Sequence, residues 1–273
     1  MPIKLSEAAY GQLLEKDHDK ALSIANRYSF VNANLFSLLT REEQDMMTGF
    51  QEVNKKLLPE VNQHLDDVYP IFPKLGEHGM IQRMNPYKGW EGSTKHQMLL
   101  GFCNVGMSPE VDMAITASGI LVGNSLFHNP KRSDLQEKAL QEIYAGTKVG
   151  GIGITEMGNG SDAVNMKLKA VVEPDGSFTY NGVKVYTTNG AVADYFTTYG
   201  VTDISEPRRT MMLGLFERGT PGLTSERIAI PAARGVGIAK VTYENVKGNK
   251  DQMVAPPGEG YKRLFRGLRS EER

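Results

Sequence analysis

The hydrophobic pattern of this 273-residue chain changes its period once, and that change constrains the fold more than any other feature. Up to about residue 146, apolar residues recur at steps of three and four, as they do on helices with one buried face. From Val149 they recur at every second residue, as Met166, Leu168 and Ala170 do between lysines, and this pattern indicates half-buried strands. The sequence therefore predicts an α+β fold, with an all-α part followed by an antiparallel barrel or sandwich.

Two capping boxes predict where helices begin. Thr40 with Glu43, and Ser133 with Gln136, have the spacing at which a hydroxyl accepts one free N–H and the later side chain reaches back to another. Pro59 is expected to kink or split the first of these helices, and the second is expected to stop near Gly146. Further helices are expected over residues 73–78, with Gly79 as a stop, over 96–105, and over about 110–127.

Turn residues divide the second half into short strands. Residues 174–176, Pro-Asp-Gly, predict a turn by composition. Asn181-Gly182, between two apolar runs, predicts a hairpin turn. Further strands are expected over residues 195–201, 211–216 and 238–246. Residues 258–273 return to a helical pattern, and Leu264, Phe265 and Leu268 are expected to form an exposed apolar face on that helix.

The bulk composition excludes several classes of protein. A net charge of −1 leaves no broad basic surface, so no nucleic-acid partner is expected. A single cysteine, Cys103, excludes an internal disulfide and fits a reducing compartment. The N-terminus is too charged for a signal peptide. The longest apolar stretch, residues 113–127, is shorter than the ~20 residues of a membrane span. We therefore expect a cytoplasmic protein without a membrane span, and we predict no metal site.

Two segments place a threonine at or just past a strand end. Residues 153–162, GITEMGNGSD, contain Thr155 followed by a glycine loop, and residues 181–190, NGVKVYTTNG, contain Thr188. Taken alone, glycine loops are usually turns, and threonine is a common strand residue.

Together these two segments resemble the acyl-CoA dehydrogenase family, whose first signature and hairpin they match in turn. Residues 76–79 at a helix end and 220–222 between strands also fit, and the resemblance covers nearly the whole chain. It implies an N-terminal helical domain over residues 1–148, a middle β-barrel over 149–257, and the start of a C-terminal helix over 258–273. In that family the two domains sandwich the isoalloxazine ring of FAD beside an acyl-CoA thioester. The C-terminal four-helix bundle that follows in the family is missing from this sequence.

The resemblance also implies a set of FAD-binding residues. The strand that ends at Thr155 would lie along the ring, with the Thr155 hydroxyl at the pyrimidine edge. Thr188 would lie near N5, the atom that receives the hydride, and Tyr186 would stack where family members often have Trp. The glycine loop would let the backbone approach FAD phosphate or CoA, and Ser161 matches a position that contacts the CoA arm. The predicted cofactor-binding residues are Ile152, Ile154, Thr155, Gly160, Ser161, Tyr186, Thr187 and Thr188, with Ser161 also substrate-binding.

The sequence departs from the family pattern at three positions. Asn165 stands where the signature prefers a small residue, and Val236 stands where a serine is common, which leaves FAD or subunit contacts there in doubt. Arg269 stands where the family often has an Asp in contact with substrate, after what looks like one extra residue.

We identify no catalytic residue in this chain. Removal of the α-proton needs a desolvated carboxylate within ~3 Å of it. Glu156 is expected to have a structural hydrogen-bonding role, His128 to end a helix, and Glu91 and Asp112 have no supporting context.

The sequence therefore predicts the FAD-binding subunit of a split acyl-CoA dehydrogenase. A second subunit, docked on the helix that starts at residue 258, would carry the helical bundle and the base. By the same resemblance, an electron-transfer flavoprotein would be the electron acceptor. The alternatives are a non-catalytic interaction protein on the same fold, a related flavin-dependent monooxygenase, and a truncated form of a longer enzyme.

Overall fold

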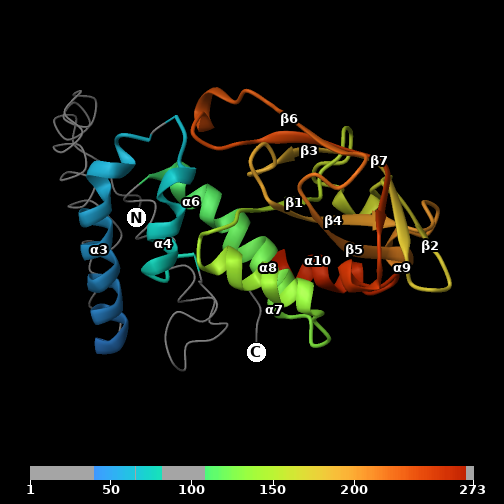
Figure 1. The fold of residues 1–273 in the computed structure, drawn as a ribbon, viewed down its shortest axis with the longest axis horizontal. Helices are drawn as coiled ribbons and strands as arrows, with labels where there is room; N and C mark the ends of the chain where they lie inside the picture. Colours follow the sequence, from blue (N-terminus) through green and yellow to red (C-terminus); the bar gives the residue numbers. More distant parts are fainter. Residues whose placement is uncertain (1–39, 65, 82–107, 269–273) are drawn as a thin grey trace, which may run out of the picture.

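The computed structural model describes residues 40–64, 66–81 and 108–268 of the chain. Figure 1 shows helices α3 (Arg41–Val61) and α4 (Phe72–Glu77) at one end and a half built mostly from strands at the other. The expected α+β class is therefore confirmed. The helix expected over residues 96–105, together with Glu91, Cys103 and Arg269, lies outside the described residues.

The first two helices begin and end largely as the sequence predicts. Thr40 Oγ1 accepts the Glu43 N–H at 3.3 Å, and Glu43 Oε2 accepts the Thr40 N–H at 2.8 Å, so the capping box of α3 is confirmed. Helix α4 is followed by Gly79 at φ 68°, which confirms the glycine stop. The expectation that Pro59 splits α3 is wrong. Pro59 lies in the last turn, where a missing N–H forfeits only one helical hydrogen bond.

The helix expected over residues 110–127 is continuous but changes its winding. It consists of α6 (Pro109–Ile115), the π-helical segment η4 (Thr116–Val122) and α7 (Gly123–Phe127). Most of its side chains are buried, as expected. A Cβ at Gly119 would lie 2.1 Å from the Ile81 carbonyl oxygen. Only glycine lets η4 pack this closely on that backbone.

Helix α8 (Asp134–Tyr144) starts at its predicted cap, but the second half of the box is wrong. Ser133 Oγ accepts the Gln136 N–H at 3.3 Å, as expected. The Gln136 amide instead donates to the carbonyls of Asp251 at 2.8 Å and Met253 at 3.3 Å, and its oxygen accepts from Asn129 at 2.7 Å. The buried amide therefore joins α8 to the strand half of the molecule.

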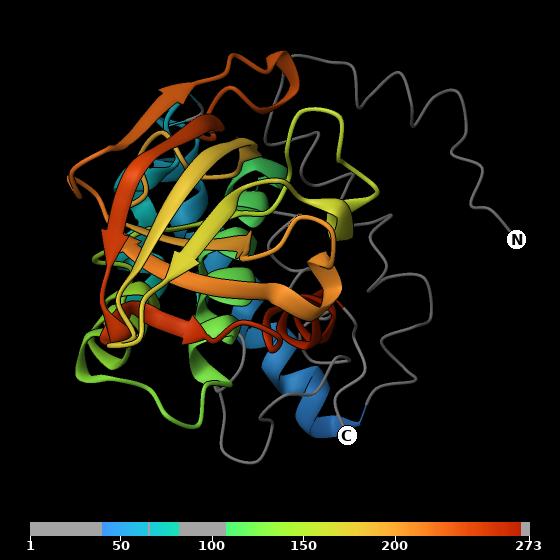
Figure 2. The same ribbon diagram turned by 90° about the vertical axis from the view of Figure 1, so that its right-hand side faces the viewer.

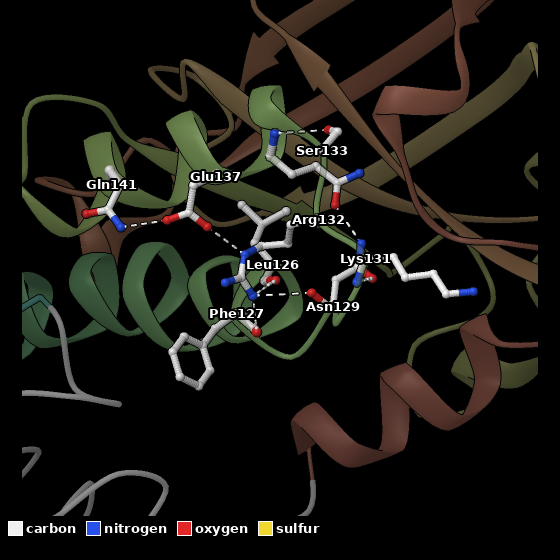
Figure 3. Close-up of polar contacts among 9 residues, drawn as sticks. Leu126, Phe127, Asn129, Lys131, Arg132, Ser133, Glu137 and Gln141 are labelled. Atoms are coloured by element: carbon white, nitrogen blue, oxygen red, sulfur yellow. Dashed lines mark hydrogen bonds and ion pairs between the residues drawn. The ribbon is translucent and has the colours of Figure 1, made fainter.

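Arg132 closes the corner between α7 and α8, as Figure 3 shows. Its guanidinium donates to the carbonyls of Leu126, Phe127 and Asn129 at the C-terminal end of α7, where helical carbonyls run out of main-chain partners. Its Nε lies 2.7 Å from Glu137 Oε2, and the Glu137 carboxylate also accepts from Gln141. These hydrogen bonds lower the pKa of Glu137. The cluster is a helix cap whose polar groups bind one another.

Eight strands form one mixed sheet in the order β6-β7-β3-β2-β4-β5-β8, with β1 paired to β4. Figure 2 shows the sheet as curved, with the helices of residues 109–144 behind it. The strands are β1 (Gly150–Gly153), β2 (Lys169–Val172), β3 (Phe178–Thr187), β4 (Tyr195–Val201), β5 (Met211–Glu217), β6 (Leu223–Arg227), β7 (Ala239–Gly248) and β8 (Met253–Ala255). Short helices are η3 (Tyr69–Ile71), η5 (Ala163–Asn165), α9 (Pro207–Thr210), η6 (Pro231–Ala233) and η7 (Lys250–Gln252).

The pairing differs from the expected antiparallel barrel in two details. The hydrogen-bonded path is open between β6 and β8, and β1 and β2 both run parallel to β4. These two strands lie end to end along β4, because residues 154–168 leave the sheet between them.

The hairpin turn expected at Asn181-Gly182 is wrong. The segment stays inside β3, opposite a bulge in which β7 carries one extra residue and Asn245 has φ 53°. The turn predicted at residues 174–176 is confirmed and connects β2 to β3. Asn181 Oδ1 accepts the Asn245 N–H of β7 across the bulge at 2.8 Å.

The hydrophobic cores cross the expected boundary at residue 148. One cluster joins α3, α4 and α6 to Val149, Val236 and Ile238. A second joins η4, α7 and α8 to side chains of β4 and β5. A third fills the inside of the sheet around Tyr180, Phe216 and Tyr243. The domain division at residues 148 and 257 stays a prediction.

The sequence predicts that the last helix exposes an apolar face that includes Leu264, and this prediction is wrong for Leu264. In α10 (Gly260–Leu268), Leu264 is only 2% exposed and belongs to the second core cluster. Phe265 is half-buried against the same cluster and packs on Tyr261 with ring centroids 4.7 Å apart. The side chain of Leu268 lies outside those described. The helix already has a partner within this chain, because it packs on β5, α9 and α7.

Asn189 joins the helices, β1 and the turn after β3. Its amide nitrogen donates to the carbonyls of Ala114 at 2.9 Å and Gly150 at 3.0 Å. Its oxygen accepts from the Tyr69 hydroxyl at 2.8 Å, and that hydroxyl accepts the Gly237 N–H at 2.8 Å. Asn189 is fully buried at φ 65°, a backbone conformation that asparagine tolerates better than most residues.

We predict that Tyr69→Phe lowers the free energy of unfolding by about 1–3 kcal/mol, because it leaves the Gly237 N–H and the Asn189 oxygen without a partner. Urea unfolding followed by circular dichroism measures the change. Tyr261→Phe is the matched control, since that hydroxyl makes no hydrogen bond with the described residues. Equal stability of the two variants would contradict the role of Tyr69.

Candidate functional site

The glycine loop is held to the sheet by the carboxylate of Glu156. Its two oxygens accept the main-chain N–H groups of Lys167 at 2.6 Å and Leu168 at 2.9 Å. Oε1 also lies 2.7 Å from Nζ of Lys184, which itself donates to the Ile154 carbonyl at 2.9 Å. The structural role expected for Glu156 is therefore confirmed.

Lys184 is a residue of this site that the sequence reasoning missed. Its side chain is 0% exposed, and burial lowers its pKa to about 8, although the neighbouring carboxylate favours the charged form. In the run VKVY the lysine looks like the outward residue of an alternating strand. A signal lies only in the opposite charge of Glu156, 28 residues away.

A bulge at the end of β3 turns Tyr186 outward. The pairing with β7 shifts register between Lys184 and Thr187, and Tyr186 has φ 55°. A left-handed aromatic residue is uncommon and is held in place by its surroundings. Thr187 consequently points inward, as Lys184 does three residues before it, and Tyr186 is 56% exposed. Bulges often re-aim a side chain in this way beside binding sites.

A groove of about 460 Å³ lies beside Tyr186. It brings the glycine loop, the end of β3 and the β6–β7 edge together at one surface. Three apolar side chains of the groove, those of Met157, Val183 and Tyr186, are exposed to solvent. Clustered exposed apolar side chains often mark a binding site. The lining residues are Met157, Val183, Val185, Tyr186, Glu226, Arg227, Ile228 and Lys240.

The predicted threonines divide into two kinds. Thr155 and Thr188 are half-buried, and neither hydroxyl makes a hydrogen bond with the residues that the structure describes. The Thr155 carbonyl accepts the Val185 N–H at 2.9 Å, so the two segments are joined by backbone. Thr187 is only 2% exposed, and its Oγ1 is buried without a partner. Its side chain faces the space above Gly151 and Gly190.

The remaining predicted residues flank these threonines. Ile152 and Ile154 are half-buried against the second core cluster. Gly160 and Ser161 are exposed, and a Cβ at Gly160 would meet open space. Asn165, the residue that departs from the family signature, donates to Asp162 Oδ2 at 2.6 Å and accepts from Asn159 through its carbonyl. The departure therefore stabilises the glycine loop from within.

Arg218 is a second residue that sequence reasoning missed. Its Nε donates to the Ala193 carbonyl at 2.7 Å and its Nη2 to the Gly190 carbonyl at 3.1 Å. The guanidinium also lies over the Phe196 ring, 5.6 Å from the centroid. It therefore holds the turn that follows Thr188. No local pattern around residue 218 indicates this role.

The other candidate bases gain no support. His128 is the C-terminal cap of α7 and packs edge-on against Phe127, as expected for a helix-end residue. Asp112 lies in the first turn of α6 and is half-buried. Within the described ranges, no three His, Cys, Asp or Glu side chains group where they could hold a metal ion. None of the helices there combines the length and hydropathy that a membrane crossing requires.

Comparison with known proteins identifies the strand half. Residues 151–246, which include the glycine loop, Lys184 and Tyr186, match the family described as acyl-CoA dehydrogenase, middle domain. The strand half of this chain therefore matches the middle domain of the acyl-CoA dehydrogenase family. The match contains both segments on which the sequence resemblance was based.

Two relatives show how far the similarity extends. The short-chain specific acyl-CoA dehydrogenase of Megasphaera elsdenii is 31% identical over 131 residues, which are 46% of this chain and 33% of that protein. The mitochondrial isovaleryl-CoA dehydrogenase of Pongo abelii is 27% identical over 267 residues, covering 88% and 61%. This chain thus spans about a third to three-fifths of the length of these family members.

Solved structures of the family share the fold. The butyryl-CoA dehydrogenase of Megasphaera elsdenii aligns with a TM-score of 0.74 at 24% identity, covering 84% of this chain and 62% of that one. A glutaryl-CoA dehydrogenase of Mycobacterium smegmatis, solved in complex with FADH2, aligns with a TM-score of 0.73 at 22% identity, covering 86% and 60%.

We predict that Lys184 makes the stability of the chain rise with pH above pH 8. The folded pKa of about 8 lies below the ordinary 10.5, so between these values the unfolded chain binds more protons. The contribution totals about 3 kcal/mol. Buried tyrosines such as Tyr180 have raised pKa values and act in the opposite direction above about pH 10.

The measurement is therefore the difference between the wild type and Lys184→Met in urea unfolding at pH 7.5, 8.5 and 9.5. The wild-type curve should climb relative to the variant. Lys169→Met, on an exposed lysine of β2, is the control and should follow the wild type. Parallel curves for wild type and Lys184→Met would show that Lys184 titrates normally.

Proposed function

We propose that this chain is the FAD-binding part of an acyl-CoA dehydrogenase, which removes hydrogen from Cα and Cβ of an acyl-CoA thioester. The observation that carries the proposal is the meeting of the family's two signature segments at one surface. There, Thr155 and Thr188 are half-buried on segments joined by a main-chain hydrogen bond, and residues of both segments line the groove beside the outward Tyr186. A merely structural surface would have no need of unpaired hydroxyls beside an exposed aromatic ring.

The residues present fit a flavin. An isoalloxazine ring offers a flat apolar face and a polar pyrimidine edge. Tyr186, with Met157 in the same groove, supplies an apolar and aromatic surface for the face. Thr155 and Thr188 would supply donors for polar atoms, and the strand that contains Ile152 and Ile154 would lie along the ring. The exposed loop at Gly160 and Ser161 leaves room for a phosphate or for the CoA arm.

This chain would bind and orient FAD, and it would not itself carry out the proton transfer. FAD, when bound, supplies the acceptor for the hydride that leaves Cβ. Thr155 and Thr188 would fix the ring by its polar edge, and Tyr186 would exclude water from one face. Removal of the α-proton requires a carboxylate with a free oxygen. Glu156 is poorly suited, because it is buried and its carboxylate is held by the N–H groups of Lys167 and Leu168 and by the Lys184 ammonium.

We therefore assign the base to a second subunit that carries the C-terminal helical bundle. Its docking surface is not Leu264, which is buried in this chain. We further propose an electron-transfer flavoprotein as the electron acceptor. This chain is 25% identical, with a TM-score of 0.74, to a chain in a solved structure of the electron transferring flavoprotein of Acidaminococcus fermentans. Size-exclusion chromatography and an acyl-CoA dehydrogenase assay, with and without the partner, test this assignment. Full activity of the isolated chain would overturn it.

We predict that Thr155→Val combined with Thr188→Val weakens FAD binding by about 1–3 kcal/mol, because two hydrogen-bond donors are lost. Quenching of flavin fluorescence on titration with the protein measures the affinity. Thr179→Val, on the same strand as Tyr186 but at its other end, is the matched control. Unchanged affinity of the double variant would remove these threonines from the site.

Tyr186→Ala should loosen FAD by about 0.5–1.5 kcal/mol and shift its visible spectrum, since a stacked ring is lost. Tyr186→Trp should retain both the affinity and the spectrum. The comparison is informative because neither substitution relieves the left-handed backbone at this position. An alanine variant with the wild-type spectrum and affinity would assign Tyr186 a purely structural role.

A further inference from the structure

The peptide between Ile154 and Thr155 has a buried cation on one side and a free donor on the other. Nζ of Lys184 donates to the Ile154 carbonyl at 2.9 Å. The described residues contain no cis peptide, and in a trans peptide the C=O and the N–H point in opposite directions. The Thr155 N–H therefore points away from Lys184. It has no acceptor among the residues described, although Thr155 is half-buried.

A cation on a carbonyl oxygen strengthens the donor at the other end of the same peptide. Hydrogen bonds in series polarise one another, and low dielectric surroundings enlarge the effect. Lys184 is 0% exposed, so water does not screen it. The Thr155 N–H is consequently a better donor than an ordinary main-chain amide, and its direction is fixed.

The Lys184 ammonium has two close oxygen contacts, the Ile154 carbonyl and the Glu156 carboxylate. Glu156 Oε1 lies at 2.7 Å, and its negative charge is shared with the N–H groups of Lys167 and Leu168. The Met166 sulfur lies at 3.7 Å. The nearby Tyr243 hydroxyl is bonded to Thr198, and burial raises its pKa, so it stays neutral. Among the described residues, Glu156 is the charged group that forms an ion pair with the ammonium.

We propose that Lys184 is a positioning residue, which acts through the Ile154 carbonyl to aim and strengthen the Thr155 N–H as a donor for the reduced, more electron-rich form of the bound ring. This inference rests on the proposed FAD site. A donor strengthened in this way stabilises a negatively charged acceptor more than a neutral one. Lys184 would thus raise the reduction potential of the flavin without touching it.

The first test uses the full chain without flavin. In ¹⁵N-labelled protein, the Thr155 amide proton should lie further downfield in the wild type than in Lys184→Met. In the wild type it should also move upfield as pH rises through about 8, where Lys184 loses its proton. The amide of Val172 on β2 is the internal control and should not move. A Thr155 amide insensitive both to the substitution and to pH would overturn the proposal.

The second test measures the midpoint potential of bound FAD. Lys184→Met should weaken binding of the reduced form roughly tenfold more than binding of the oxidised form. For a two-electron couple this is a fall of about 30 mV. Lys169→Met, on an exposed lysine of β2, should leave the potential unchanged. A merely structural Lys184 would change stability and leave the potential of bound FAD as it is, which would overturn the proposal.

The two tests separate the inference from the proposed function. If wild-type chain with its partner binds no FAD, the proposed function fails, while the Thr155 amide in the free chain still decides the role of Lys184. If Lys184→Met does not fold, the pH titration of the wild-type amide decides it alone.

Discussion

The arrangement of the site depends on one buried amide, that of Asn189. Its nitrogen donates to a carbonyl of α6 and to a carbonyl of β1, and its oxygen accepts from Tyr69. The same residue takes the left-handed conformation that turns the chain after Thr188. Because a buried amide is costly when unpaired, all of its bonds must form together. The side chain of Asn189 thereby bonds the helical half, the first strand and the threonine segment to one another.

In the same region, the buried Lys184–Glu156 ion pair is stabilised by neighbouring main-chain groups. Burying an ion pair costs several kcal/mol of desolvation per ion, which the mutual attraction offsets only when other groups satisfy the remaining lone pairs. Here two main-chain N–H groups and one carbonyl do so. The arrangement explains why the glutamate of the signature is not available as a base, and why the glycine loop keeps its place while its tip is exposed.

Much of the fold could be predicted because its signals are local. The capping box at Thr40, the glycine stop after α4 and the alternation of Met166 with its neighbours each depend on residues a few positions apart. The misses depend on tertiary pairing. Asn181-Gly182 has the composition of a turn, but β7 pairs along the whole of β3 and keeps the segment inside the strand. Lys184 reads as outward because of its charge, although it lies on the same side of β3 as the buried Phe178 and Tyr180. The site residues were found by resemblance, whereas their supports, Lys184 and Arg218, have no local signature.

The shared cores have a consequence for how the molecule comes apart. Val149, Val236 and Ile238 complete the packing of the first helices, and Leu264 completes a cluster that contains α7 and α8. Elements that bury one another's apolar surface open together and exchange their amide protons at similar rates. A chain severed at the helix–strand junction would leave two fragments with incomplete interiors, so we expect the helical and strand halves to unfold together.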